Sequence, residues 1–281
     1  MLLARLASAA LLAPLVLLFV WWGGWPFVAL VAAVAVWSTL EYARLLEQAG
    51  RRPAWPVGLI GAACLAAAPA VPGTHLGALA MAVALLGPGV YLLAEAAPVG
   101  PGAVQDWALT TLGSLLVGWP LAQAVALRQP PEPTTLLGLG AIAGQPVTHG
   151  LLLALVVLTC TWASDSAAYG AGRLWGRRPF FAAISPRKTL EGAAAGLVAP
   201  TLVALAWAPP LGWPLPFAIV LGASAGVAAL AGDLLESALK RSVGAKDAGW
   251  LIPGHGGLLD RVDGLLLVLV AVALLTGEVW P

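Results

Sequence analysis

The stretch GLLLVLVAVALL, from Gly264 to Leu275, contains no polar side chain and limits the kind of fold that this sequence can form. A run of this composition is typical of a helix in lipid. The segment directly before it, residues 246–263, holds six ionisable residues in 18 positions. The contrast indicates a lipid-embedded helix that follows a polar segment at the membrane surface.

The composition extends this interpretation to the whole chain. The sequence of 281 residues is 60% hydrophobic and only 10% charged, whereas soluble domains carry about a quarter charged residues. Repeated apolar runs are long enough to cross a bilayer, and the period-two alternation of membrane strands is absent. We therefore expect an all-α, polytopic integral membrane protein with about nine transmembrane helices. The expected spans are 2–20, 25–43, 57–71, 75–94, 106–127, 147–163, 191–208, 214–238 and 264–279.

Several other classes of protein are disfavoured. The net charge of +1 and the lack of a basic tail argue against nucleic-acid binding. Cys64 and Cys160 lie in apolar runs without a CxxC pattern, so they are expected to pack in the core rather than to bind zinc. The first apolar run is followed almost at once by a second, which favours a retained helix over a cleaved signal peptide.

Lys and Arg residues predict the orientation. With the N-terminus in the cytoplasm and nine crossings, 13 of the 14 basic residues lie on the cytoplasmic side, and Arg128 is the exception. Cytoplasmic loops of membrane proteins carry such an excess. We expect an N-in, C-out protein of the inner (cytoplasmic) membrane with its polar segments in the cytoplasm.

The charges also divide the chain. Residues 165–263 hold 9 of the 14 basic and 7 of the 13 acidic residues. Residues 1–146 are expected to form scaffold helices, and residues 147–281 are expected to form the catalytic part. Acids near hydrocarbon are costly unless they are paired or functional.

The first polar cluster is TWASDSAAYGAGRLWGRR, residues 161–178. Asp165 is expected at the inner end of the sixth span, as a site residue or as a helix-end charge in water. The glycines and arginines after it predict a flexible basic loop. Such a loop could hold phosphates or contact anionic lipid headgroups.

The second cluster is SPRKTLEG, residues 185–192. Ser185 followed by Pro186 is typical of a helix start, with Ser as the cap. Helix N-termini favour anions, and Arg187 and Lys188 add positive charge. A phosphate site and a plain capped helix both explain this pattern.

The third cluster joins GDLLESALKR, residues 232–241, to the segment 246–263. Helical spacing places Asp233, Ser237 and Lys240 on one face, together with Glu236. Asp260 and Asp263 are one turn apart at the start of the ninth helix. Carboxylates with nearby Lys and Arg favour a Mg²⁺-phosphate site, while a salt-bridged hairpin is the alternative.

Between these helices, the sequence PGHGG places His255 among glycines. The absence of side chains at Gly256 and Gly257 would let a bulky anion approach the backbone. His255 could bind a phosphate, or it could only stabilise the loop.

The segment SALKRSVGAKDAGWLIPGHGGLLDRVD, residues 237–263, resembles the signature of the phosphatidate cytidylyltransferases (CDP-diacylglycerol synthases). The segments DSAAYGAGRLWG, SPRKTLEG and GDLLES are similar to further segments of that family, in the same order. The strong resemblance covers about residues 160–264. It implies the Mg²⁺-dependent reaction of CTP with phosphatidate in the bilayer, which gives CDP-diacylglycerol and pyrophosphate for phospholipid biosynthesis.

The resemblance and the local pattern together suggest roles for individual residues. Asp233 and Asp260 are the expected metal ligands, with Asp263 as a second candidate. The expected catalytic residues are Asp233, Asp260, Asp263, Lys240 and Lys246. The expected substrate-binding residues are Ser185, Arg187, Lys188, Ser237, Arg241, His255, Gly256, Gly257, Arg261 and Asp165. A homodimer and a second, monovalent cation are compatible with the resemblance.

Two rival functions follow from the same residues. One is a related membrane CTP-dependent transferase or kinase that acts on another lipid phosphate or on a polyprenol. The other is a cation-coupled transporter, which predicts acids near the bilayer midplane and inverted repeats. The clustering of acids near the expected cytoplasmic edge, with no visible repeat, favours the transferase.

Overall fold

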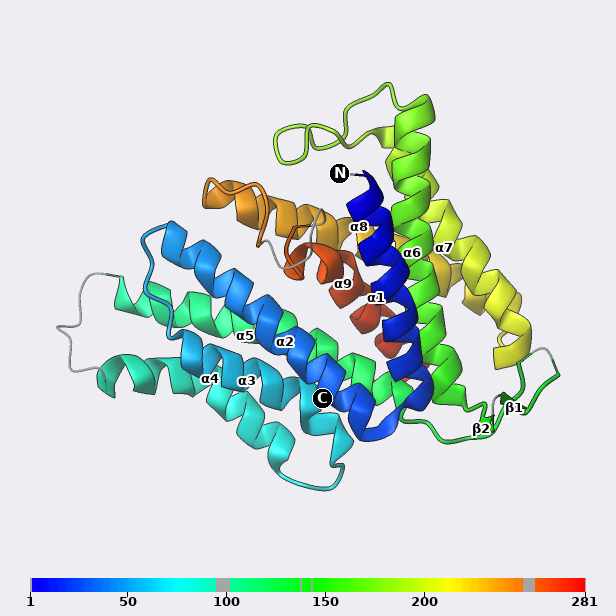
Figure 1. Cartoon of the computed structure of the whole chain (residues 1–281), viewed down its shortest axis with the longest axis horizontal. Coiled ribbons are helices and arrows are strands. Elements are labelled where there is room, and N and C mark those ends of the chain that lie inside the picture. The colour runs from blue at the N-terminus through cyan, green and yellow to red at the C-terminus, as the bar shows by residue number, and fades with distance from the viewer. Residues whose placement is uncertain (1, 95–101, 137, 143, 250–255, 281) are drawn as a thin grey trace. The chain divides into compact units, whose positions relative to one another are not determined.

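The structure, a computed structural model, describes residues 2–94, 102–136, 138–142, 144–249 and 256–280. These residues form α-helices, one 3₁₀ turn and one short hairpin (Figure 1). The helices are α1 (Leu2–Trp22), α2 (Gly24–Gln48), α3 (Trp55–Ala67), α4 (Leu76–Ala94), α5 (Ala103–Arg128), α6 (His149–Trp175), α7 (Leu190–Leu211), α8 (Leu215–Ser242) and α9 (Leu259–Thr276). The turn is η1 (Ala68–Ala70), and the hairpin pairs β1 (Ala141–Ile142) with β2 (Gln145–Pro146) in antiparallel register. The expectation of an all-α fold is confirmed.

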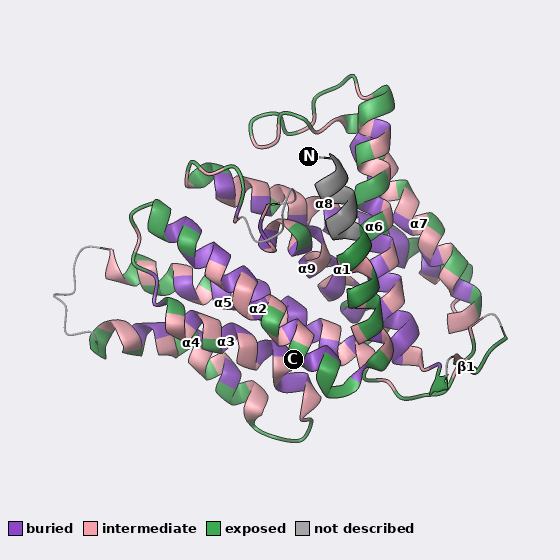
Figure 2. Ribbon diagram, in the orientation of Figure 1, coloured by how far each residue is buried: buried purple, intermediate pink, exposed green. Residues whose placement is uncertain are grey.

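Among the described residues, six helices are long and apolar enough to cross a membrane, namely α2, α4, α5, α6, α7 and α8. The protein is therefore a multi-pass membrane protein. The apolar part of α1 and the combined α3–η1 segment are shorter, and α9 carries three charged residues within its 18 positions. Large apolar side chains such as Leu86, Val90 and Leu93 on α4 are exposed, as suits helices that face lipid (Figure 2).

Contacts between residues divide the chain into two compact units that are both discontinuous in sequence. The first unit comprises residues 1–126, 240–262 and 280. The second comprises residues 127–239, 263–279 and 281. Helices α8 and α9 contribute residues to both units. The expected boundary after residue 146, between scaffold helices and the catalytic part of the chain, stays a prediction.

In the first unit, small residues let helices approach closely. A Cβ atom at Gly61 would lie 3.1 Å from the Cα atom of Ala84, so α3 and α4 pack through their backbones. Gly113 on α5 lies against the ring of Tyr42, whose hydroxyl donates a hydrogen bond to the carbonyl of Leu109 at 3.1 Å. Close backbone approach of this kind is the usual way in which membrane helices associate.

In the second unit, glycines mark successive helix contacts. Ser164 on α6 donates a hydrogen bond to the carbonyl of Gly196 on α7 at 2.9 Å. A Cβ atom at Gly226 on α8 would lie 2.9 Å from the Cα atom of Leu197. Further along α8, Gly232 lies directly against the carbonyl of Asp263 on α9. These contacts let neighbouring helices among α6, α7, α8 and α9 approach closely.

The expected spans overlap all nine helices of the described residues, but two predictions about helix ends were wrong. Helix α6 continues to Trp175, so Asp165 lies within a helix, and the expected flexible loop begins only after residue 175. Gly172 costs helix stability relative to Ala, yet a Cβ atom there would lie only 3.2 Å from Oγ1 of Thr189, the N-cap of α7. Helix packing therefore explains a glycine that resembles a loop signal in the sequence.

The second wrong prediction concerns the start of α7. Thr189, not Ser185, is the N-cap, and its hydroxyl accepts a hydrogen bond from the backbone N–H of Gly192 at 3.2 Å. Ser185 lies in the preceding loop, where its N–H donates to the carbonyl of Phe181. That loop is closed by two backbone hydrogen bonds, from Phe180 to Lys188 and from Leu190 to Arg178. Because of these bonds, the N-cap of α7 lies four residues after Ser185, where the Ser-Pro pair had predicted it.

Candidate functional site

In the second unit, the loop before α7 meets α8 through an ion pair. The Nζ atom of Lys188 lies 2.6 Å from Oδ2 of Asp233. The hydroxyl of Ser237, one turn along α8, donates to Oδ1 of the same carboxylate at 3.4 Å. The Lys188 side chain is 18% exposed, whereas that of Asp233 is 41% exposed. A half-exposed carboxylate that retains an open side could accept a further ligand.

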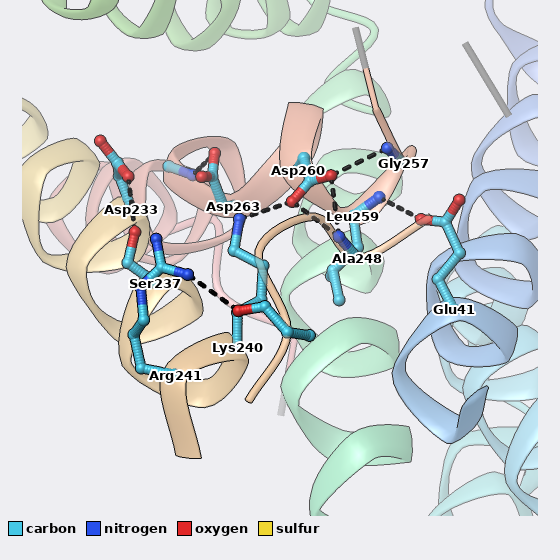
Figure 3. Close-up of polar contacts among 12 residues, drawn as sticks. Glu41, Asp233, Ser237, Lys240, Arg241, Ala248, Gly257, Leu259, Asp260 and Asp263 are labelled. Atoms are coloured by element: carbon cyan, nitrogen blue, oxygen red, sulfur yellow. Dashed lines mark hydrogen bonds and ion pairs between the residues drawn. The ribbon is translucent and has the colours of Figure 1, made fainter. Parts of the chain in front are cut away.

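The close approach of α8 and α9 brings a second acid to this region. Gly232 directly precedes Asp233 and lies against the backbone of Asp263. Gly264 lies against Ala229, with its Cβ position 3.2 Å from that carbonyl oxygen. A side chain at Gly232 would push the two helices apart, and one at Gly264 would make a tight contact. The glycines therefore place Asp233 and Asp263 on neighbouring helices at the point of contact (Figure 3).

In the first unit, Asp260 is the centre of a hydrogen-bond cluster. Its Oδ1 atom lies 2.6 Å from Nζ of Lys240, in the last turn of α8. The backbone N–H groups of Ala248 and Gly257 also donate to the carboxylate, at 3.0 and 2.8 Å (Figure 3). The two charged side chains are only 7% and 11% exposed. Asp260 thus joins the end of α8, the following loop and the start of α9.

A buried acid from α2 lies on the other side of the same loop. Glu41 is 2% exposed and accepts a hydrogen bond from the backbone N–H of Leu259 at 2.8 Å. Its other oxygen accepts from Nε1 of Trp37 at 3.1 Å. The sequence interpretation missed Glu41, because it treated the first part of the chain as scaffold. The available signal was an acid inside the expected span 25–43.

The other predicted site residues occupy more open positions. Arg241 is exposed, and its guanidinium donates to the carbonyl of Ala245 at 2.8 Å. Ser185 is half-buried in its loop. Four further predicted site residues are exposed, namely Arg187, Lys246, Arg261 and Asp165. His255 lies outside the described residues.

One glycine of the predicted PGHGG loop, Gly257, is explained by packing within the protein. Gly257 is buried, and a Cβ atom there would lie 2.6 Å from Oε2 of Glu41. Gly256 adopts a φ of 82°, a conformation that glycine tolerates at low cost. The absent side chain at Gly257 therefore makes room for Glu41, and the approach of an anion to this loop stays a prediction.

Within the described ranges, no three His, Cys, Asp or Glu side chains form a group that could hold a metal ion. The donor chemistry nevertheless suits magnesium, since carboxylate oxygens are ligands that Mg²⁺ prefers. Asp233 retains an exposed carboxylate. The carboxylate of Asp260 already accepts hydrogen bonds at both oxygens, so a metal ion there would have to share it with Lys240 or replace that lysine.

Comparison with known proteins gives a consistent result. The chain is 45% identical over 116 residues to phosphatidate cytidylyltransferase of Synechocystis, covering 41% of this chain and 39% of that protein. It is 38% identical over 123 residues to the Bacillus subtilis protein of the same name, covering 43% and 46%. It is 44% identical over 121 residues to chloroplastic phosphatidate cytidylyltransferase 5 of Arabidopsis thaliana, covering 42% and 30%.

These matches span less than half the length of each relative. A family model covers far more of the chain. The model of the cytidylyltransferase family matches residues 3–277, which include every described helix from α2 to α9. The chain therefore belongs to the cytidylyltransferase family.

Proposed function

We propose that this protein is a phosphatidate cytidylyltransferase, a membrane nucleotidyltransferase that converts CTP and phosphatidate to CDP-diacylglycerol and pyrophosphate. The observation that carries the proposal is the 38–45% identity to proteins with that name from Synechocystis, Bacillus subtilis and Arabidopsis thaliana. The family match over residues 3–277 supports the cytidylyl-transfer part of the reaction.

The proposed reaction is an in-line displacement at phosphorus. A phosphate oxygen of phosphatidate attacks the α-phosphorus of CTP and forms a new P–O bond. The bond between the α-phosphorus and the bridging oxygen breaks, and pyrophosphate leaves with that electron pair. Both reactants are anions, so the site must mainly neutralise charge and align the groups. The lipid phosphate is already ionised at neutral pH and needs no strong base.

The lysines of the two ion pairs suit this task. Lys188 and Lys240 are both mostly buried, and each is held by a carboxylate at 2.6 Å. A fixed, desolvated cation stabilises a developing charge more strongly than a mobile one in water. We assign Lys188 and Lys240 to phosphate or pyrophosphate contacts. The exposed Arg187, Arg241, Lys246 and Arg261 are suited to meet CTP as it enters from water.

Magnesium is part of the proposal. Asp233 and Asp260 would hold it, with Asp263 as a further candidate ligand, and the bound ion would neutralise phosphate charge. Asp233 fits this role best, because its carboxylate is partly exposed and is oriented by Ser237. A second, monovalent cation and a homodimer stay predictions, and neither is needed for this step.

The membrane arrangement completes the proposal. We place the N-terminus in the cytoplasm, with nine crossings of the cytoplasmic membrane, so that the loops around Lys188 and Asp260 face the cytoplasm. The bias of 13 of 14 basic residues toward that side supports this orientation. The lipid substrate then stays in its leaflet, while CTP and pyrophosphate exchange with the cytoplasm.

The proposal is tested with purified protein in mixed micelles that contain Mg²⁺, CTP and one candidate acceptor lipid at a time. Pyrophosphate release should depend on phosphatidate and should stop when EDTA removes Mg²⁺. Release with a polyprenyl phosphate but not with phosphatidate would favour the rival that acts on another lipid phosphate. ATP in place of CTP serves as the nucleotide control.

A further inference from the structure

Glu41 is an acid in an unusual position, because its side chain is buried on a helix that carries none of the predicted site residues. It is 2% exposed. Its Oε2 atom accepts a hydrogen bond from the backbone N–H of Leu259, the first residue of α9, at 2.8 Å. The N–H groups of the first helical turn have no partner within the helix. Glu41 therefore supplies a cap to α9 from a segment 218 residues away in sequence.

Two glycines enclose the same carboxylate. A Cβ atom at Gly249 would collide with Oε1 of Glu41, and one at Gly257 would lie 2.6 Å from Oε2. Real Cβ atoms do not approach other heavy atoms so closely. Both positions therefore exclude side chains while Glu41 stays in place. Gly249, in the segment after α8, and Gly257, just before α9, are thus fitted around this one side chain.

The residues beside these contacts bind Asp260. Ala248, next to Gly249, donates its N–H to Asp260 at 3.0 Å. Gly257 itself donates its N–H to Asp260 at 2.8 Å. The two short backbone segments lie between the two acids, with Glu41 on one side and Asp260 on the other (Figure 3). A shift of Glu41 would move the donors that orient the Asp260 carboxylate.

We propose that Glu41 is a positioning residue, which holds the backbone at Gly249, at Gly257 and in the first turn of α9 so that Asp260 and its partner Lys240 are correctly placed for cytidylyl transfer. The inference rests on the proposed function and extends it to α2. Glu41 acts through the backbone at Leu259, Gly257 and Gly249. It is not assigned a contact with substrate or metal.

The test uses the chemistry of the two hydrogen bonds. In Glu41→Gln, one oxygen becomes an NH₂ group that cannot accept a hydrogen bond. The two donors, Trp37 Nε1 and the N–H of Leu259, then compete for one acceptor. The double variant Trp37→Phe/Glu41→Gln removes one donor and leaves the Gln carbonyl free to accept from Leu259. If Glu41 served only as a polar group of this size, adding Trp37→Phe would not change the activity of the Glu41→Gln variant.

The matched control is Gln123→Leu. Gln123 is also fully buried in the first unit, and its amide bonds the backbone of Trp280 at both groups, at 2.9 and 3.1 Å. Its loss removes buried hydrogen bonds of the same kind, away from Asp260. This variant should lower the unfolding temperature without lowering kcat per folded molecule. It therefore separates general destabilisation from misplacement of the site.

Two measurements are made on full-length protein in micelles, normalised to the folded fraction. For Glu41→Gln we expect kcat to fall by roughly ten- to a hundredfold, because small misplacements of reacting groups slow reactions by factors of this order. The KM for CTP should change little. The double variant should recover most of that loss. Hydrogen exchange in the peptide that contains Gly257 and Leu259 should accelerate in Glu41→Gln and return toward normal in the double variant.

A normal kcat in Glu41→Gln would overturn the proposal, and so would a double variant as impaired as the single one. Unchanged hydrogen exchange in this peptide would overturn it as well. A wild-type protein that transfers nothing to phosphatidate would instead refute the proposed function. The exchange measurement needs no substrate, so in that case it would still decide whether Glu41 holds the loop.

Discussion

The carboxylate of Asp260 lies 2.6 Å from the ammonium group of Lys240, and both side chains are almost fully buried. The corresponding pair in the second unit, Lys188 and Asp233, has the same separation but a more exposed carboxylate. Each of the two acids expected to bind magnesium, Asp233 and Asp260, is thus paired with a lysine. Buried pairs of this kind are sensitive to the loss of one partner, because the other charge is then left in a poorly solvated place.

Replacement of Lys240 by Met should therefore destabilise the protein and abolish activity. Removing one partner of a buried pair costs about 3–5 kcal/mol, and the Asp260 side chain is only 7% exposed. Thermal unfolding in detergent measures the first effect, and cytidylyl transfer measures the second. Arg241→Met removes a neighbouring but exposed charge, so its unfolding temperature should stay close to that of the wild type. Equal effects of the two substitutions on stability would contradict this account of the pair.

Replacement of Asp233 by Asn should weaken the response to magnesium. Asn keeps the shape of Asp but loses the charge that both Lys188 and a divalent cation require. We expect the Mg²⁺ concentration for half-maximal activity to rise by at least roughly tenfold, since one lost charge-assisted contact is worth about 1.5–3 kcal/mol. A magnesium titration of activity checks this. Glu132→Gln, a change at an exposed acid in the loop before α6, serves as the control. An unaltered titration for Asp233→Asn would remove this residue from the metal site.

An Ala side chain at Gly257 should not fit. Its Cβ atom would lie 2.6 Å from Oε2 of Glu41 and 2.7 Å from the nitrogen of Gly249. Overpacking of this kind typically costs about 1–3 kcal/mol, and the displaced loop should also lower activity. Gly170→Ala is the control, because no atom lies within 4 Å of that Cβ position. It should leave stability unchanged or raise it by up to about 1 kcal/mol. Similar stabilities for the two variants would argue against the close contact with Glu41.

The corrected start of α7 is tested by a pair of substitutions. Thr189→Ala removes the hydroxyl that accepts from the N–H of Gly192 and should cost about 1 kcal/mol of stability. Ser185→Ala should have a smaller effect on stability, because Ser185 is not the cap. Thermal unfolding of the two variants side by side decides the point. A larger loss for Ser185→Ala would restore the Ser-Pro cap that the sequence suggested.

Hydropathy predicted the helices well, because long apolar runs in lipid have few alternatives to helix. The helix ends were harder to predict. The sequence after residue 163 is polar and glycine-rich, yet α6 continues to Trp175, and Gly172 lies within it, close to the N-cap Thr189 of α7. Similarly, backbone bonds in the loop before α7 favour Thr189 over Ser185 as the cap. Local signals cannot show which tertiary contact a glycine or a serine serves.

The candidate site was predictable where its residues are close in sequence. Lys240 and Asp260 are 20 positions apart and fall in one charged cluster. The pairing of Lys188 with Asp233 joins two clusters that the sequence presents separately. The partner of Glu41 could not be predicted, because its contact with Leu259 spans 218 positions. The acid itself, within an apolar span, was the only local signal of a buried role. Such long-range contacts follow from the packing of helices and leave no local pattern.

Two parallel labelling reactions test cytidylyl transfer to phosphatidate, each with phosphatidate, Mg²⁺ and CTP labelled at either the α- or the γ-phosphate. We expect the α-label to enter the lipid as CDP-diacylglycerol, while the γ-label leaves in pyrophosphate. Transfer of the γ-label to lipid would show a kinase and contradict the proposed function. Absence of both labels from the lipid, in protein that is folded and supplied with magnesium, would contradict it equally.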